Sequence, residues 1–298
     1  MASPSYFDPH ALARLSGLEL RARRLVEGYV AGMHRSPFHG FSVEFSQHRE
    51  YAQGDDLRYV DWKVFGRSDK LYLKQFEEET NLIVYFALDA SESMSFRGPE
   101  AAMSKLDYAK CVVAAFTWLA LRQRDSASLA VFAERVERVT RPSGSFAAWE
   151  ELVHCLEQTS PHAPTKAGDA LGELAERFRR RGLVIVLSDL FDEPESLLTG
   201  LRHCRHAGHD VIVFQVLDAA ELDFPFTRPT LFLGLEGLPD LQTDPGDIRA
   251  GYLQALADHR QTLQAGLRNQ QADYHLLRTD EPLDRALSLY LATRMQRT

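Results

Sequence analysis

From residue 82 onward, apolar stretches alternate with amphipathic stretches along the chain. Seven apolar residues in a row, Leu82 to Leu88, are typical of a strand that is buried on both faces of a parallel sheet. Further strands are predicted at 128–133, 183–189, 211–218 and 274–277, and helices at 105–124, 168–181, 196–208, 245–269 and from about 282. This alternation predicts an α/β fold: a doubly wound, mainly parallel sheet with helices on both faces.

The first eighty residues follow a different pattern. Asp8 followed by Pro9 predicts the start of an N-terminal helix, whose apolar face continues to about Val30. Residues 40–76 alternate apolar with charged positions around turn-forming clusters, which predicts a small β-rich segment. We therefore expect a boundary near residue 80, with the N-terminal helix and the β-rich segment in 1–79 and the α/β domain in 80–298.

Composition narrows the class of protein. A chain of 298 residues with 45% hydrophobic content can bury a large core, and its net charge of −8 disfavours a nucleic-acid binder, including an RNA binder. No apolar stretch approaches the roughly 18 to 20 residues that cross a bilayer, and the first residues lack the pattern of a signal peptide. Three cysteines without a CxxC pair indicate reduced thiols. We expect a cytoplasmic protein.

Carboxylates and hydroxyls follow the predicted strands. Asp89, Asp189 and Asp218 each end one, so a parallel sheet would gather them at one edge, where we expect Asp89 to face solvent. Ser91 and Ser93 lie in the turn that leaves the first of these strands. Oxygen ligands without His or Cys suit a hard cation such as Mg²⁺ or Mn²⁺. We count Asp218 as a source of negative potential rather than as a ligand.

The order of these residues resembles the metal-ion-dependent adhesion site of von Willebrand factor A domains. The matching residues are Asp89, Ser91, Ser93, Thr165 and Asp189. The resemblance implies that the hydroxyls contact the metal directly or through water, that the aspartates act largely through water, and that a partner protein donates a carboxylate. Thr159 is the alternative to Thr165, which we prefer because Leu171 follows it at the spacing expected of the next helix.

The front of the chain adds a second resemblance. The string YAQGDDLRYVDW at 51–62 and its flanks at 34–45 and 63–79 are similar to the bacterial family called domain of unknown function 58. Members of that family are often encoded beside MoxR-type AAA+ ATPases. The resemblance covers nearly the whole chain, although Ser126 to Ser128 depart from the expected Arg and Gly. It implies an adaptor or assembly factor whose partner is a MoxR-type ATPase, a client that presents an acidic residue, or both.

Several alternatives stay open beside this non-enzymatic interpretation. The chain has no Gly-x-x-x-x-Gly-Lys-Ser/Thr loop, so it is not itself the ATPase motor. A Mg²⁺-dependent phosphoryl-transfer hydrolase could also use carboxylates at strand ends. The serine-rich turn could simply cap a helix, and the charged 54–62 string could be structural or a partner surface. A zinc site is a further possibility, formed by His203, Cys204, His206 and His209.

Overall fold

The structure, a computed structural model, describes residues 8–33, 48–50, 72–74 and 82–295. The N-terminal helices form one compact unit with the chain from residue 82 onward, and residues 34–81 form a second unit. Of the second unit the structure describes one antiparallel pair, β1 (His48–Glu50) with β2 (Tyr72–Lys74). The rest of the predicted β-rich segment, including the 54–62 string, lies outside the described residues.

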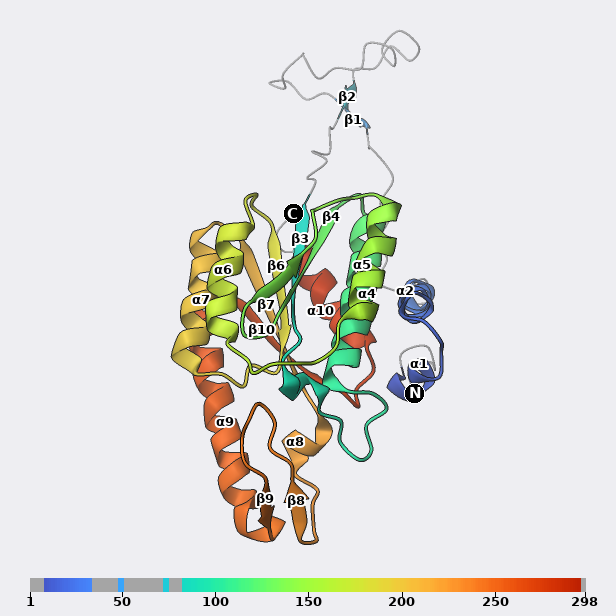
Figure 1. Cartoon of the computed structure of the whole chain (residues 1–298). Helices are drawn as coiled ribbons and strands as arrows, with labels where there is room; N and C mark the ends of the chain where they lie inside the picture. The colour runs from blue at the N-terminus through green and yellow to red at the C-terminus, as the bar shows by residue number, and fades with distance from the viewer. Residues whose placement is uncertain (1–7, 34–47, 51–71, 75–81, 296–298) are drawn as a thin grey trace. The chain divides into compact units, whose positions relative to one another are not determined.

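A six-stranded sheet forms the centre of the larger unit (Figure 1). Its strand order is β10-β7-β6-β3-β4-β5, and every neighbouring pair is parallel except β4 with β5. The strands are β3 (Ile83–Asp89), β4 (Ser126–Phe132), β5 (Val136–Val139), β6 (Leu183–Ser188), β7 (Asp210–Leu217) and β10 (Asp273–Arg278). The predicted α/β fold class is confirmed, with the apolar run at 82–88 in the middle of the sheet. The short antiparallel edge strand β5 was not predicted.

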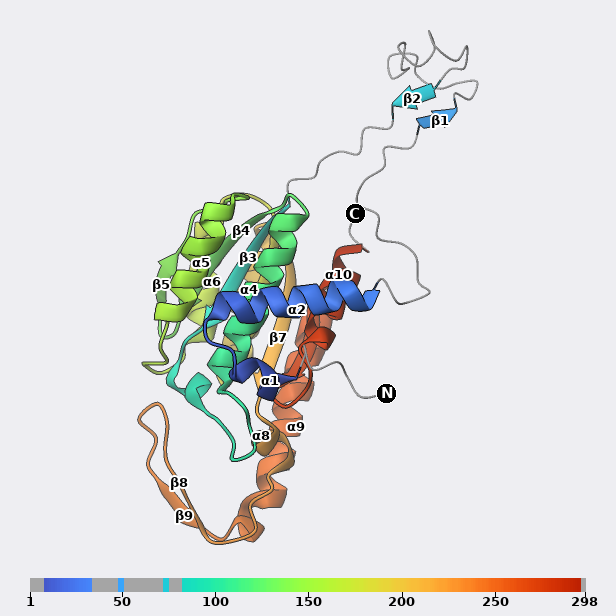
Figure 2. The same cartoon turned by 90° about the vertical axis from the view of Figure 1, so that its right-hand side faces the viewer.

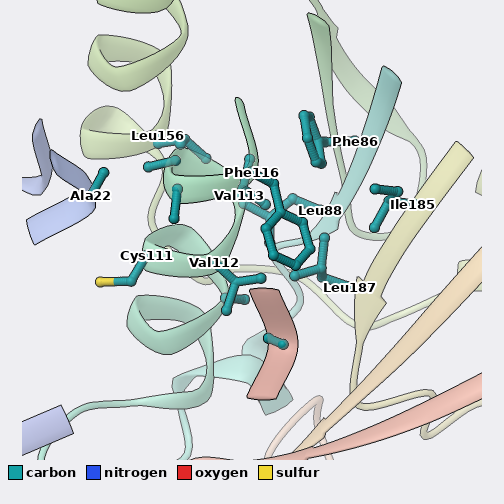
Figure 3. Packing of buried hydrophobic residues seen from close by; sticks show 14 of the residues in the cluster. Ala22, Phe86, Leu88, Cys111, Val112, Val113, Phe116, Leu156, Ile185 and Leu187 are labelled. Atoms are coloured by element: carbon teal, nitrogen blue, oxygen red, sulfur yellow. The ribbon is translucent and has the colours of Figure 1, made fainter. Parts of the chain in front are cut away.

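Helices cover both faces of this sheet (Figure 1). On one face lie α4 (Lys105–Arg122), α5 (Phe146–Gln158) and α10 (Asp284–Met295), and on the other lie α6 (Ala167–Arg177), α7 (Pro194–His206) and α9 (Pro245–Asn269). Successive side chains of a strand point to opposite faces, so β3 contributes to both layers. Phe86 and Leu88 pack toward Phe116 of α4 (Figure 3), whereas Tyr85 stacks on Phe178 at 4.2 Å between ring centroids.

The predicted N-terminal helix is broken into two, α1 (Pro9–Ala13) and α2 (Leu18–Met33). Asp8 caps α1 by accepting a hydrogen bond from the His10 backbone N–H, as the Asp-Pro start predicts. The single-helix prediction is wrong because Gly17 adopts a φ of +83°, which ends the helical path. Both helices pack on the α4 side of the sheet (Figure 2), where Leu12 and Leu25 are buried. The structure thus groups them with the sheet, whereas the sequence analysis placed them in 1–79.

Between β7 and α9 the chain forms a short helix and a hairpin, in a stretch for which the sequence analysis predicted no helix or strand. The helix is α8 (Ala219–Asp223), and the hairpin joins β8 (Thr230–Phe232) to β9 (Leu241–Thr243). Phe224, Phe226 and Phe232 form a cluster of aromatic rings at strand β8 of the hairpin. Figure 2 shows the hairpin turning back toward the loop that follows β3, which contains the 3-10 helix η2 (Glu92–Ser95).

Among the described residues, no helix combines the length and the apolar character that a membrane span requires.

Candidate metal centre at the carboxyl edge of the sheet

The candidate site lies where the order of the strands reverses direction. From β3 the chain continues to β4 on one side, and then returns to β6 on the other side of β3. In open α/β sheets, ligands bind at the carboxyl ends of the strands at such a switch point. Asp89 is the last residue of β3, and Asp189 directly follows β6. The fold therefore brings these two aspartates to neighbouring positions on one edge.

Asp89 is fully buried, which corrects the expectation that it faces solvent. Its Oδ1 accepts a hydrogen bond from the Ser91 backbone N–H at 2.8 Å, and its Oδ2 accepts one from Ser188 Oγ at 2.5 Å. Burial, followed by the neighbouring charge of Asp189, raises the pKa of Asp89 to about 7. Truncating Asp89 to alanine would leave these donors unpaired inside the protein, so this substitution does not test a binding role cleanly.

The hydroxyl groups near Asp89 do not cap the helix that follows it. Ser91 occupies the N-cap position of η2, yet its side chain makes no capping hydrogen bond. Its Oγ instead lies 3.1 Å from Ser93 Oγ. Thr165, in the loop before α6, has a buried Oγ1 that finds no hydrogen-bond partner among the described residues. An unpaired buried hydroxyl is costly, and a ligand that uses its oxygen would remove that cost.

Asp189 is paired with a buried lysine that the sequence analysis did not identify. Lys105 Nζ lies 2.7 Å from Asp189 Oδ2 and 2.7 Å from Glu221 Oε1, and its side chain is 1% exposed. Burial alone would lower the pKa of Lys105, but the two carboxylates reverse the effect and raise it above its ordinary value. The sequence did contain one indication of this ion pair. Lys105 lies in the first turn of a helix, where a positive charge is unfavourable to the helix dipole unless a nearby acidic group compensates it.

The loops that carry these hydroxyls are joined by Glu236, at the tip of the β8–β9 hairpin. Its carboxylate accepts hydrogen bonds from the backbone N–H groups of Ser93 and Thr165. The structure thus brings Thr165 to the Ser91–Ser93 turn, although about seventy residues of sequence separate them. No sequence pattern singled out Glu236, because the hairpin that carries it was not predicted.

The residues at this edge fit a hard divalent cation. The oxygens comprise the hydroxyls of Ser91 and Ser93, the orphaned Thr165 Oγ1, and the carboxylates of Asp89 and Asp189. Such an oxygen set without His or Cys suits Mg²⁺ or Mn²⁺ rather than zinc. The metal assignment stays a prediction, and the orphaned threonine hydroxyl is the observation that favours it.

Comparison with known proteins identifies the family. The sequence model of the family described as "Protein of unknown function DUF58" matches residues 47–262. The chain belongs to this family. Uncharacterized proteins of Mycobacterium bovis and of Mycobacterium tuberculosis are each 28% identical to it over 280 residues, which cover 92% of this chain and 86% of theirs.

Two solved structures resemble this DUF58 protein weakly. One is a conserved hypothetical protein, BatB, from Bacteroides thetaiotaomicron, with a TM-score of 0.46, 18% identity, and coverage of 73% of this chain and 100% of that one. The other is the SpRpn10 VWA domain, with a TM-score of 0.43, 10% identity, and coverage of 70% and 93%. Both TM-scores are below 0.5, and neither likeness says anything about function.

The third strand-end aspartate of the DUF58 chain has a structural role. Asp218 caps α8 by accepting a hydrogen bond from the Ala220 backbone N–H at 2.8 Å. It also accepts hydrogen bonds from the Gly98 backbone N–H at 3.1 Å and from Thr279 Oγ1 at 3.0 Å. These contacts hold three segments together at the edge of the sheet.

The alternative zinc site does not form. His209 is buried beside the rings of Tyr85 and Phe178, whereas His203 and His206 are exposed on α7. In the part of the chain that the structure describes, no group of three or more His, Cys, Asp or Glu side chains could hold a metal ion. The His and Cys residues at the end of α7 therefore do not converge.

Proposed function

We propose that this protein is a divalent-cation-dependent protein-binding module whose binding site is the carboxyl edge of the sheet at β3 and β6. The observation that carries the proposal is the buried Thr165 hydroxyl, which lacks a partner although it lies beside the Ser91–Ser93 turn. The turn also carries the hydroxyls of Ser91 and Ser93, and Ser91 follows the buried carboxylate of Asp89. A bound cation would give the Thr165 oxygen a partner and could use these further oxygens as ligands.

In this proposal Ser91, Ser93 and Thr165 hold Mg²⁺ or Mn²⁺ through their hydroxyls, and Asp89 and Asp189 act mainly through water. When bound, the cation supplies a positive centre that can accept a carboxylate from another protein. Lys105 neutralises part of the charge of Asp189, so the site keeps a moderate negative charge and binds the cation weakly until a partner contributes.

The proposed partners are a MoxR-type AAA+ ATPase, a client protein that presents an acidic residue, or both, in the cytoplasm. The ATPase is taken from the family resemblance, and the acidic residue from the chemistry of a cation with an open position. The protein would then be an adaptor or assembly factor for the ATPase. The buried, hydrogen-bonded state of Asp89 disfavours the rival hydrolase, whose nucleophile must reach a substrate phosphorus.

Thr165→Val tests the metal site. Valine keeps the shape of the side chain and removes a hydroxyl that makes no hydrogen bond, so the fold should keep its stability. The affinity for Mn²⁺, measured by titration calorimetry, should fall at least about tenfold. Thr262→Val is the matched control, because Thr262 is exposed on α9 and its hydroxyl bonds only to the Asp258 carbonyl within the helix.

Equal Mn²⁺ affinity in wild type and Thr165→Val would reject the site. The same variants test the binding function in a pull-down with a MoxR-type ATPase from the host. Association should require Mg²⁺, disappear with EDTA and with Thr165→Val, and persist with Thr262→Val. If association is unchanged by EDTA and by Thr165→Val, the interface lies elsewhere on the protein, and the 54–62 string is the next candidate.

A further inference from the structure

The tip of the β8–β9 hairpin contacts both hydroxyl-bearing loops of the candidate site. Glu236 Oε1 accepts a hydrogen bond from the Ser93 backbone N–H at 3.3 Å, and its Oε2 accepts one from the Thr165 backbone N–H at 3.1 Å. In return, the Glu236 backbone N–H donates to Glu92 Oε2 at 2.7 Å. One glutamate carboxylate thus contacts both Ser93 and Thr165, the residue whose hydroxyl is orphaned.

Among the described residues, few apolar contacts hold the tip in this place. The strands of the hairpin are anchored by Phe232, whose ring lies 5.8 Å from that of Phe224 and 5.2 Å from that of Phe226. The other large apolar side chains are mostly exposed: Leu231 and Leu241 in the strands and Leu233 and Leu238 in the connecting loop are exposed by 50 to 69%, whereas Leu235 is half-buried. The position of the tip therefore depends largely on its polar contacts, while Phe232 holds the strands.

The backbone at the tip is also held in an unfavourable conformation. Glu236 has a φ of 56°, in the left-handed region that residues with a side chain rarely adopt. The strain is tolerated while the three hydrogen bonds of Glu236 and Glu92 are in place, and losing them would favour a different conformation of the turn.

We propose that Glu236 is an intramolecular carboxylate ligand of this site, which fills the place of a partner's acidic side chain and must be displaced before a partner can bind. The geometry supports this assignment because the Glu236 carboxylate already lies beside Ser93 and Thr165, two of the residues proposed to hold the cation. The inference rests on the proposed function, yet the closure of the hairpin can be tested without any metal.

Glu236→Gln is the test variant. Glutamine keeps the length of the side chain, but only one of its two terminal atoms can accept a hydrogen bond. Its amide nitrogen would face the backbone N–H of Ser93 or of Thr165, a donor against a donor. Glu176→Gln is the matched control, because Glu176 is exposed near the end of α6 that is remote from Thr165.

The first measurement is amide hydrogen exchange of the whole protein in EDTA. In Glu236→Gln, the amides of Ser93, Thr165 and Glu236 should exchange about tenfold faster than in wild type, whereas Glu176→Gln should match wild type. Exchange at these amides that is equally fast in wild type and Glu236→Gln would overturn the closed hairpin. Neither result depends on whether the site binds a cation, so this outcome is separate from the Thr165→Val test.

The second measurement is competition in the presence of Mn²⁺. The probe is the blocked peptide acetyl-Gly-Glu-Gly-amide, with acetyl-Gly-Gln-Gly-amide as its uncharged counterpart. Glu236→Gln should bind the acidic peptide at least about tenfold more tightly than wild type does, because no internal carboxylate competes. The glutamine peptide should bind neither protein. Equal binding of the acidic peptide by both proteins, including none by either, would overturn the assignment of Glu236 as its competitor.

Discussion

At the scale of single residues, charge is buried next to the proposed metal site and is balanced within the protein. Asp189 lies close enough to Asp89 for its charge to raise the pKa of Asp89, and Lys105 compensates by pairing with Asp189 and Glu221. Removing one member of such a group leaves an unpaired buried charge, which is strongly destabilising. A substitution of one of these charged residues would therefore change both the stability of the fold and the binding of a ligand. A substitution of Thr165 should change binding alone.

A buried histidine should make stability depend on pH. Burial lowers the pKa of His209 below its ordinary value of 6.5, so the unfolded chain takes up a proton at a higher pH than the folded protein does. The stability that neutral His209 provides is present above about pH 6.5 and is lost as the pH falls below it. In His209→Gln, the drop in melting temperature between pH 7 and pH 5 should be smaller by about 2 to 4 °C.

His206→Gln is the control for this experiment, because it makes the same substitution at an exposed position on α7. A profile for His209→Gln that superimposes on that of wild type would show that His209 does not titrate differently on folding.

At the scale of elements, glycines determine where one helix ends and how closely two helices pack. Gly17 separates α1 from α2 with its positive φ, which allows Leu12 and Leu25 to reach the same core from two helices. Gly168 and Gly200 allow α6 and α7 to approach closely, because a Cβ at Gly200 would lie 2.2 Å from the Gly168 carbonyl oxygen. The start of α6, and with it the Thr165 loop, is therefore fixed against α7.

Gly17→Ala should destabilise the protein by about 1 kcal/mol. An added Cβ at Gly17 would meet no atom within 4 Å, so the cost comes only from the left-handed backbone. Gly251→Ala is the matched control: Gly251 is in the interior of α9, also with nothing within 4 Å, and alanine should stabilise that helix by up to about 1 kcal/mol. Urea denaturation measures both values. Equal effects of the two substitutions would contradict the role given to the backbone of Gly17.

At the scale of the whole molecule, the N-terminal helices and the sheet share one hydrophobic core. Leu12, Leu18 and Leu25 are buried in the same cluster as Phe116 of α4 and Phe86 of β3. Roughly fifty residues separate α2 from β3, so this unit is built from two stretches of the chain that are not consecutive in sequence. Unfolding of the N-terminal helices should therefore be coupled to unfolding of the sheet.

Leu25→Ala should lower the free energy of unfolding of the whole sheet unit by about 2 to 4 kcal/mol, because it opens a cavity in the shared core. Leu20→Ala, on the same helix but 47% exposed, should change it by less than about 0.5 kcal/mol. Thermal unfolding followed by the circular dichroism of the helices and by tryptophan fluorescence should give one coincident transition. A separate early transition in Leu25→Ala would show that the N-terminal helices unfold independently.

The periodicity of the sequence determined the α/β fold, because a strand buried on both faces needs an uninterrupted apolar run and a covering helix needs an apolar stripe. It also placed Asp89 and Asp189 at one edge, since parallel strands end on the same side. These patterns are local in the sequence, and every parallel sheet gathers the ends of its strands at one edge. The strand β5 and the β8–β9 hairpin were not predicted, because such short elements do not show a clear apolar pattern.

Only the tertiary structure decided which distant groups meet. Burial of Asp89 depends on the loops that fold over the strand end, and the pairing of Lys105 with Asp189 joins positions 84 residues apart. Glu236 reaches Ser93 across 143 residues through a hairpin whose own sequence is weakly patterned. Such contacts depend on how whole elements pack. A period of two or 3.6 residues in the sequence predicts a strand or a helix, but it does not predict which distant residues meet.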